Sequence, residues 1–375
     1  HVSWVGDVYK RQEEQRRGWL LTKTPFMAKS DLYKISGHWD HYKDGMFVLG
    51  DEEKDKEVFA LRPMTCPFQY QAYLNRKRSY RDLPLRYNET STLFRNEASG
   101  EMHGLIRVRQ FTISEGHLMC TPEQLEDEFR KCLELAIFML KTLGLYEDVS
   151  YRFSQWDPND RAKYIGTEEQ WNEAQGLMER ILNHLEIPYE IGIGEAAFYG
   201  PKLDIQIKNV YGKEDTLITI QIDQMLAEQF GMVYTDKDGK QKTPCIIHRT
   251  SIGCYERTLA LLIEKYAGAF PLWLAPVQVK LLPIADRHLD YLYEVKKQLE
   301  DKGFRCEVDD RSEKIGYKIR EAQLEKVPYM VVVGDKDIEN NTISIRKRKE
   351  GDLGAMTVEQ FLEKIVPDRD NKVID

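Results

Sequence analysis

Two short blocks decide the fold of this chain: FRNE at residues 94–97 and GLIRVRQF at residues 104–111. A loop rich in small residues joins them. The segments that contain the blocks, 91–97 and 105–114, have the length and composition of strands. Two strands joined by such a loop predict a β-hairpin, and the other elements are placed around it.

The returning strand of this hairpin would carry its charges on one face. Alternate side chains of a strand share a face, so Arg107 and Arg109 would lie beside Phe111, while Ile106 and Val108 would point to a core. Arginines beside an aromatic ring suit an anionic ligand with a planar base. A solvated, salt-bridged strand face explains the same spacing equally well, so the residues alone leave both interpretations open.

Composition limits the class of protein. The chain has 375 residues, 42% of them hydrophobic, which excludes a disordered chain, and no apolar run is long enough to span a bilayer. Six cysteines without a CxxC pair fit a reducing cytoplasm, where we expect the protein to be located. A net charge of −8 argues against nonspecific coating of nucleic acid but leaves room for a local RNA site.

The length predicts two domains. Prolines at positions 271 and 276 bracket a connection, so we expect one domain at 13–272, with mixed helices and strands, and a small α/β domain at 273–375. Residues 1–12 show no clear periodicity, begin with His rather than Met, and look like translated adaptor sequence. We expect them to be foreign to the fold.

Capping signals place several helices. Residues 121–124, Thr-Pro-Glu-Gln, form a capping box that predicts a helix ending at Gly144. Strands are expected at 202–208 and 217–223. The second domain is predicted to contain strands at 277–283, 304–308, 328–333 and 342–346, and helices at 286–302, 312–326 and from the capping box at Thr357 onward.

A metal site is not evident from spacing. No rule connects Cys66, His117 and His248, and the residues alone favour a buried thiol and two ordinary histidines. His38 and His41 form a rival pair three residues apart, which we interpret as structural.

The two blocks of the hairpin resemble motif 2 of class II aminoacyl-tRNA synthetases, and residues 248–257, which end in Arg257, resemble motif 3. The resemblance extends from about Gly18 to Lys364. It implies an α+β fold, in which a catalytic domain built on an antiparallel sheet precedes a small α/β anticodon-binding domain. Three further blocks narrow the resemblance to threonyl-tRNA synthetases: Ser36–Trp39, Met64–Pro67 and Ala197–Lys202.

The resemblance implies a nucleotide site. Arg95 would hold the α-phosphate of ATP and the carboxylate of threonine, Arg257 would hold the terminal phosphates, and Arg107 would lie at the phosphates too. Glu97 would contact adenine, and Phe111 would stack on it. Mg²⁺ would bridge the phosphates, positioning and charge stabilisation would supply most of the rate, and no covalent enzyme intermediate is expected.

The resemblance also implies one Zn²⁺ per chain, held by Cys66, His117 and His248 with one open position. That position would take the amino and hydroxyl groups of threonine and so reject valine. Two positions depart from the family, which commonly has Gln at Ile113 and Asp at Glu115. The residues expected to line the threonine pocket, or else to form a sheet face beside the core, are Met64, Glu115, Tyr199, Lys202, Thr219 and Gln221.

For the second domain the resemblance implies anticodon contacts at Arg346 and at Asp337, where the family has Glu; Ser312 replaces a usual Asn. Residues 275–375 contain 19 basic and 21 acidic residues, so RNA contact would depend on local patches. The basic run 346–349 is one candidate, although such a run is usually a solvated strand end.

The implied partners are ATP, threonine and tRNA(Thr), and the full-length enzyme would be a homodimer. The implied reaction joins threonine to its tRNA through a threonyl-adenylate. The chain begins inside motif 1, near residues 18–27, so we expect an N-terminally truncated enzyme that lacks an editing domain, and its own activity stays open. Two rival functions are a non-catalytic RNA-binding module and a zinc hydrolase.

Overall fold

The expected hairpin is present, and it lies in the middle of a large sheet. The computed structural model describes residues 2–374. In it, β5 (Leu85–Phe94) and β6 (Gln110–Cys120) pair antiparallel along their whole length. Residues 103–109 do not continue β6, because they form a turn with a bridge between His103 and Arg107.

This turn overturns the predicted alternation of faces. Ile106 and Val108, expected in a core, line the cavity described below. Arg109, expected beside Arg107 and Phe111, instead donates from Nε to the carbonyl of Glu97 at 3.1 Å and is exposed. The period of two applies only while the backbone stays extended, and here it does not.

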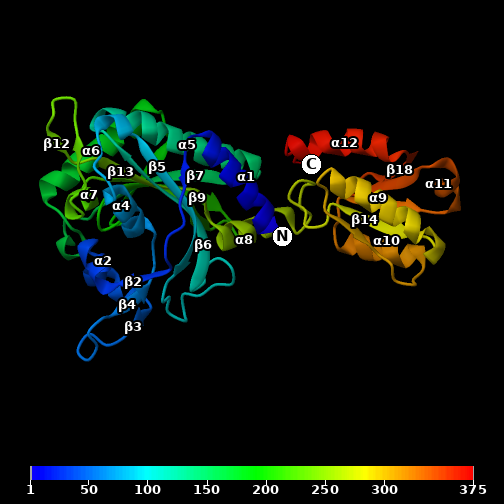
Figure 1. Ribbon diagram of the computed structural model, residues 1–375, viewed down its shortest axis with the longest axis horizontal. Helices are drawn as coiled ribbons and strands as arrows, with labels where there is room; N and C mark the ends of the chain where they lie inside the picture. Colours follow the sequence, from blue (N-terminus) through cyan, green and yellow to red (C-terminus); the bar gives the residue numbers. More distant parts are fainter. Residues whose placement is uncertain (1, 375) are drawn as a thin grey trace. The chain divides into compact units, whose positions relative to one another are not determined.

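The sheet has eight strands in the order β1-β5-β6-β13-β10-β9-β7-β8 (Figure 1). All inner pairs are antiparallel, and only the edge strands β1 and β8 pair in parallel. The remaining bounds are β1 (Leu20–Leu21), β7 (Val149–Gln155), β8 (Tyr189–Ile193), β9 (Lys202–Lys208), β10 (Glu214–Asp223) and β13 (Cys245–Cys254).

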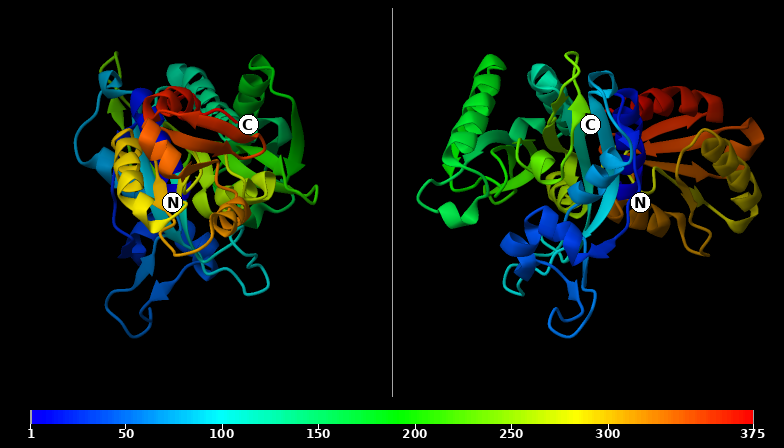
Figure 2. Two further views of the ribbon diagram at one scale, coloured as in Figure 1. Left: turned by 90° about the vertical axis from the view of Figure 1, so that its right-hand side faces the viewer. Right: turned by 60° about the vertical axis from the view of Figure 1, so that its left-hand side comes forward.

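Two long helices lie beside each other against this sheet (Figure 2). Helix α5 (Leu125–Thr142) follows the predicted capping box and buries an apolar stripe that includes Phe129 and Leu140 against β13 and β10. Helix α6 (Glu168–His184) begins at a capping box on Thr167 and meets α5 through an ion pair between His184 and Glu126.

Smaller elements surround the sheet. Helix α4 (Cys66–Leu74) carries a buried apolar cluster with Tyr70 and Tyr73 at its centre. The other elements are α1 (Val2–Arg16), β2 (Met27–Lys29), α2 (Ser30–Ile35), α3 (His38–Tyr42), β3 (Val48–Leu49), β4 (Phe59–Leu61), α7 (Leu226–Gln229), β11 (Tyr234–Thr235), β12 (Gln241–Lys242) and α8 (Tyr255–Tyr266).

Residues 2–12, expected to be foreign to the fold, fall within α1. Asp7 and Lys10 are buried, and the Lys10 ammonium lies 3.1 Å from a carboxylate oxygen of Glu14. That this segment is foreign to the protein stays a prediction about its origin.

The C-terminal part is an α/β unit around a five-stranded sheet of order β15-β14-β16-β17-β18. Sequence analysis placed most of its elements but missed α11 and β18. The strands are β14 (Val279–Pro283), β15 (Cys306–Val308), β16 (Tyr329–Val333), β17 (Ile343–Lys347) and β18 (Gly351–Met356), and the helices are α9 (Leu289–Asp301), α10 (Ile315–Leu324), α11 (Asp335–Asn340) and α12 (Val358–Asp370), which Thr357 caps as predicted.

The residues that the structure describes form two compact units, one of residues 7–261 and the other of residues 2–6 and 262–374. The functional domain boundary expected at residue 272 stays a prediction. Within the second unit, carbonyl groups of the segment before β14 accept hydrogen bonds from Arg305 and Arg348, and this attaches the connection to the unit that follows it. Among the described residues, no helix is long and apolar enough to cross a membrane.

Candidate active site

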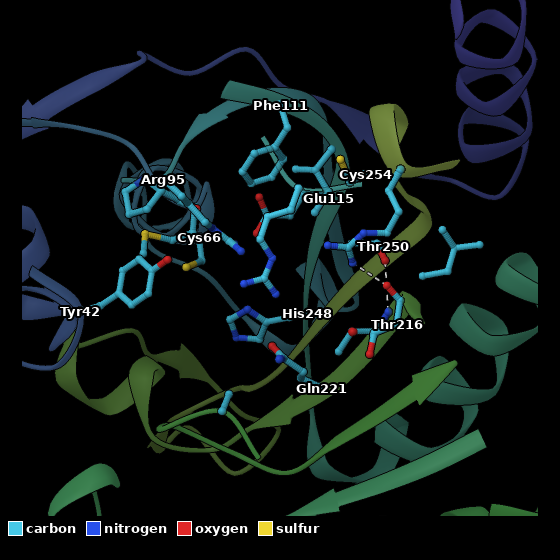
Figure 3. A pocket seen from close by; sticks show the side chains of 18 of the residues that line it. Tyr42, Cys66, Arg95, Phe111, Glu115, Thr216, Gln221, His248, Thr250 and Cys254 are labelled. Atoms are coloured by element: carbon cyan, nitrogen blue, oxygen red, sulfur yellow. Dashed lines mark hydrogen bonds between the residues drawn. The ribbon is translucent and has the colours of Figure 1, made fainter. Parts of the chain in front are cut away.

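A cavity of about 410 Å³ opens on the face of the sheet where β6, β10 and β13 run side by side. The start of α4, the loop at 197–199 and the start of α8 complete its walls. Arg95, Glu115, Cys66 and His248 point toward its centre (Figure 3).

Cys66 and His248 line this cavity, and the fully buried His117 lies next to them, with one ligand atom from each of the three residues within 4.8 Å of the others. His117 and His248 lie directly opposite each other on the paired strands β6 and β13, and Cys66 is the first residue of α4. Sheet register, which sequence spacing does not reveal, therefore joins the two histidines predicted from the family resemblance, and the start of α4 adds Cys66.

Burial shifts the pKa values of these groups in opposite directions. It raises the pKa of the Cys66 thiol well above its usual value and lowers the pKa of His117 well below its usual value. A neutral imidazole has a lone pair for a metal ion, and a bound metal ion holds the thiol as thiolate. Nε2 of His117 is buried, has no hydrogen-bond partner among the residues that the structure describes, and lies 3.5 Å from a carboxylate oxygen of Glu115. A buried imidazole nitrogen without a hydrogen bond, beside a thiol and a second imidazole, fits Zn²⁺.

The three predicted phosphate-binding arginines surround the cavity. The guanidinium of Arg95 lies 5.1 Å from the ring centroid of Phe111, and Arg107 lies 3.6 Å from the carboxylate of Glu97. Arg257, at the start of α8, donates to the carbonyls of Ile106 at 3.1 Å and of Thr216 at 2.6 Å. Burial lowers the pKa of Arg257, but a guanidinium stays cationic.

Of the six residues expected in the threonine pocket, five line the cavity: Met64, Glu115, Tyr199, Thr219 and Gln221. Lys202 does not line it. Its ammonium pairs with Asp204 at 2.6 Å, and Asp204 also accepts a hydrogen bond from Thr219 at 2.7 Å. Lys202 is the cross-strand partner of Gln221 on β10, so it lies on the same face of the sheet, beside the residues that line the cavity.

Two of these lining residues are tightly fixed. The Tyr199 hydroxyl donates to Gln221 at 2.7 Å, and its ring stacks on His248 with centroids 5.0 Å apart. Glu115 accepts the backbone N–H of Thr65 at 3.2 Å, and burial raises the pKa of its carboxyl group. Glu115, which stands where the family commonly has the shorter Asp, is therefore directed at the start of α4.

One histidine that lines the cavity was not predicted from the sequence to do so. His38, interpreted as structural, lines the cavity, and its Nδ1 lies 2.8 Å from the Ser36 hydroxyl. Its ring meets Phe198 edge to face at 4.8 Å, and burial lowers its pKa to about 3. No periodicity marks this residue, because α3 has only five residues; its place in the block Ser36–Trp39 was the available signal.

The residues expected to read the anticodon lie in the second unit. Asp337 is nearly buried and accepts hydrogen bonds from the backbone N–H of Gly334 and the hydroxyl of Ser344, both at 2.9 Å. Arg346, on β17, lies 3.5 Å from a carboxylate oxygen of Asp352. Asp337 thus stabilises its own turn, while Arg346 is only loosely paired.

Comparison with known proteins agrees with this geometry. Residues 47–266 match the family described as tRNA synthetase class II core domain (G, H, P, S and T), and residues 278–367 match the anticodon binding domain. A crystal structure described as the RNA binding domain of threonyl-tRNA synthetase from Cryptosporidium parvum Iowa II superposes with a TM-score of 0.90 at 33% identity, over 97% of this chain and 90% of that one. The chain belongs to the threonyl-tRNA synthetase family.

Bacterial relatives extend this result. Threonine–tRNA ligases of Clostridium perfringens and Clostridium botulinum (strain Eklund 17B) are 65% and 66% identical over 363 residues, which is 97% of this chain and 56% of each relative. The chain thus spans a little over half the length of these relatives. The expected fold class, a class II catalytic domain followed by an anticodon-binding domain, is confirmed.

Proposed function

We propose that the protein attaches threonine to tRNA(Thr) at the expense of ATP, through a threonyl-adenylate, with zinc selecting the amino acid. The observation that supports this most strongly is a cavity lined by Arg95, Arg257 and two members, Cys66 and His248, of a Cys-His-His set. The Cys-His-His set suits recognition of a hydroxylated amino acid, and the arginines suit a nucleoside triphosphate.

The proposed chemistry depends on positioning. A carboxylate oxygen of threonine attacks the α-phosphorus of ATP and pyrophosphate leaves, while Arg95 neutralises both reacting anions and Arg257 holds the departing phosphates. Arg107 contacts the phosphates, Glu97 contacts adenine, and Phe111 stacks on the base. Mg²⁺ would screen the phosphate charge.

Amino-acid selection would occur at the bottom of the cavity. Zinc held by Cys66, His117 and His248 would supply a Lewis acid for the amino and hydroxyl groups of threonine. Valine, which has a methyl group in place of the hydroxyl, would leave that position without a ligand, and a site built for a hydroxyl rejects such an analogue strongly. Met64, Glu115, Tyr199, Lys202, Thr219 and Gln221 would shape the surrounding pocket.

The second unit would bind the anticodon of tRNA(Thr) through Arg346 and Asp337. We further propose that the full-length enzyme is a homodimer and that it works in the cytoplasm. We also propose that the two functional domains, 13–272 and 273–375, divide near residue 272; the matched segments, which end at residue 266 and begin at residue 278, support this.

Threonine-dependent exchange of labelled pyrophosphate into ATP tests this proposal. It should be measured on this chain and on a longer protein with a complete motif 1. Exchange that depends on threonine in either protein supports the proposal. Background exchange in both would reject it and would favour a module that only binds RNA.

A further inference from the structure

The ring of His248 is held from several sides. Its Nε2 lies 2.8 Å from Oδ2 of Asp223 and 3.1 Å from the hydroxyl of Tyr70. Tyr199 stacks on its face, and His117 meets it edge to face with centroids 4.7 Å apart. The imidazole therefore has one fixed orientation, and Nδ1 is the nitrogen left for the cavity.

Asp223 is suited to fix the proton of that ring as well. It is completely buried at the end of β10, and its Oδ1 accepts the backbone N–H groups of Met225 and Leu226 at 2.8 and 2.9 Å. A carboxylate only accepts hydrogen bonds, so Oδ2 requires a proton on Nε2 of His248. The lone pair of a neutral imidazole then lies on Nδ1.

His117 has the opposite arrangement. Its Nδ1 lies 2.6 Å from Oε1 of Gln69. The amide nitrogen of Gln69 donates to the hydroxyl of Thr22 at 2.8 Å, and that hydroxyl donates in turn toward the carbonyl of Asn88 and the carboxylate of Glu89. The order of donors identifies the atom facing His117 as the amide oxygen, so Nδ1 carries the proton. Nε2, which makes no hydrogen bond among the described residues and lies 3.5 Å from Oε1 of Glu115, then carries the lone pair.

We infer that Asp223 and Gln69 are positioning residues that set opposite tautomers, so that His248 presents Nδ1 and His117 presents Nε2 beside the thiol of Cys66. The use of these lone pairs for zinc rests on the proposed function, whereas the tautomers themselves do not. Groups that orient metal-binding histidines in this way typically change metal affinity by about 10- to 100-fold.

An isosteric change separates this role from simple packing. In Asp223→Asn the amide oxygen can still accept from Met225 and Leu226, while the amide nitrogen takes the place of Oδ2. That nitrogen donates to Nε2 of His248 and moves the ring proton to Nδ1, the atom needed for the metal. In the reverse orientation of the amide side chain that this variant carries at position 223, its NH₂ group would face the backbone N–H groups of Met225 and Leu226. Donors would then face donors, so this orientation is unfavourable.

Glu128→Gln is the matched control. The same carboxylate–amide exchange is made at a buried residue of α5 that pairs with Arg86 and does not line the cavity. Both histidine tautomers should therefore stay unchanged, and zinc affinity should stay within about threefold of the wild-type value.

Two measurements test the inference. Long-range ¹H–¹⁵N spectra of zinc-free, histidine-labelled protein should show His248 protonated on Nε2 and His117 on Nδ1, with His248 changed to the Nδ1-H form in Asp223→Asn. Zinc affinity, measured by chelator competition, should fall by about 10- to 100-fold in Asp223→Asn.

Wild-type His248 protonated on Nδ1 would overturn the inference, as would an Asp223→Asn variant with wild-type tautomer and zinc affinity. If Asp223→Asn does not fold, the wild-type spectrum decides alone. A wild-type protein with the expected tautomers but no affinity for zinc would contradict the proposed metal-dependent function and still support the assignment of the two protons.

Discussion

At the scale of single residues, the cavity depends on side chains whose roles follow from what surrounds them. Cys66 is one of six free cysteines, and Cys132, on α5, is almost equally buried. Within residues 2–374, only Cys66 lies beside two histidines with which it could bind a metal ion. The chemistry of the site therefore comes from the constellation and not from the residue type.

This difference gives a prediction for Cys66→Ala. Without the thiolate, two imidazoles remain, and zinc content should fall from about one per chain to nearly zero. Elemental analysis after dialysis measures this. Cys132→Ala is the control, because it removes an equally buried thiol outside the cavity and should keep its zinc. Full zinc content in Cys66→Ala would contradict the assignment.

The limits of sequence reasoning are clearest at this scale. Spacing gave no reason to join Cys66 to His117 and His248, and the family resemblance did so. Strand register explains why spacing failed, since two residues far apart in the chain become direct cross-strand neighbours. His38 was not predicted to line the cavity, because lining a cavity is a property of tertiary structure that a five-residue helix does not signal.

At the scale of elements, the end of β13 depends on a glycine. Gly253 has a φ of +69°, and a Cβ at this position would lie 1.9 Å from the carbonyl oxygen of Leu217 on β10. The pairing of β13 with β6 shifts register between Thr250 and Cys254, so the chain turns sharply just before α8. This turn places Arg257 at the cavity.

Gly253→Ala should therefore destabilise the protein strongly. Left-handed backbone costs an alanine about 1–2 kcal/mol, and displacing the Leu217 carbonyl adds to this, so we expect a loss of at least ~3 kcal/mol in unfolding free energy. Chemical denaturation measures it. Gly212→Ala has a similar φ of +76° with nothing within 4 Å, and should cost only ~1–2 kcal/mol. Equal losses of unfolding free energy in the two variants would contradict a contribution from the close approach of residue 253 to the Leu217 carbonyl.

Elements with strong periodicity or caps were predicted well, as α5 and α12 show. The elements that were not predicted from the sequence share a physical cause. Strand β18 contains Gly351 and Gly354, both with positive φ, and α11 has only six residues, so neither carries a clear periodic signal. The turn at 103–109 has the alternating residues of a strand but not its backbone, because local hydrogen bonds close it.

At the scale of the whole molecule, the net charge of −8 argued only against nonspecific coating of nucleic acid. Membership of the threonyl-tRNA synthetase family sharpens that interpretation: tRNA would be held by placed residues and not by bulk charge. Length predicted two domains, and the described residues form two compact units, one of residues 7–261 and the other of residues 2–6 and 262–374. The boundary expected at residue 272 stays a prediction.

Arg346→Ala tests whether the second unit contributes to tRNA binding but not to activation of threonine. We expect the KM for tRNA in aminoacylation to rise by about tenfold, since one arginine contact to a base or phosphate contributes about 1–3 kcal/mol. The KM for threonine in pyrophosphate exchange should change far less. Arg130→Ala, on the exposed side of α5, is the control. An equal rise in the KM for tRNA and the KM for threonine would contradict separate roles for the two units.

The most direct test of the central claim is pyrophosphate exchange with threonine, serine and valine side by side in the zinc-loaded protein. A cavity that selects through a metal-bound hydroxyl predicts exchange with threonine, measurable exchange with serine, and a kcat/KM for valine lower by about 10⁴-fold or more. Exchange with valine within about 100-fold of threonine, the discrimination expected of a purely apolar pocket, would contradict the account.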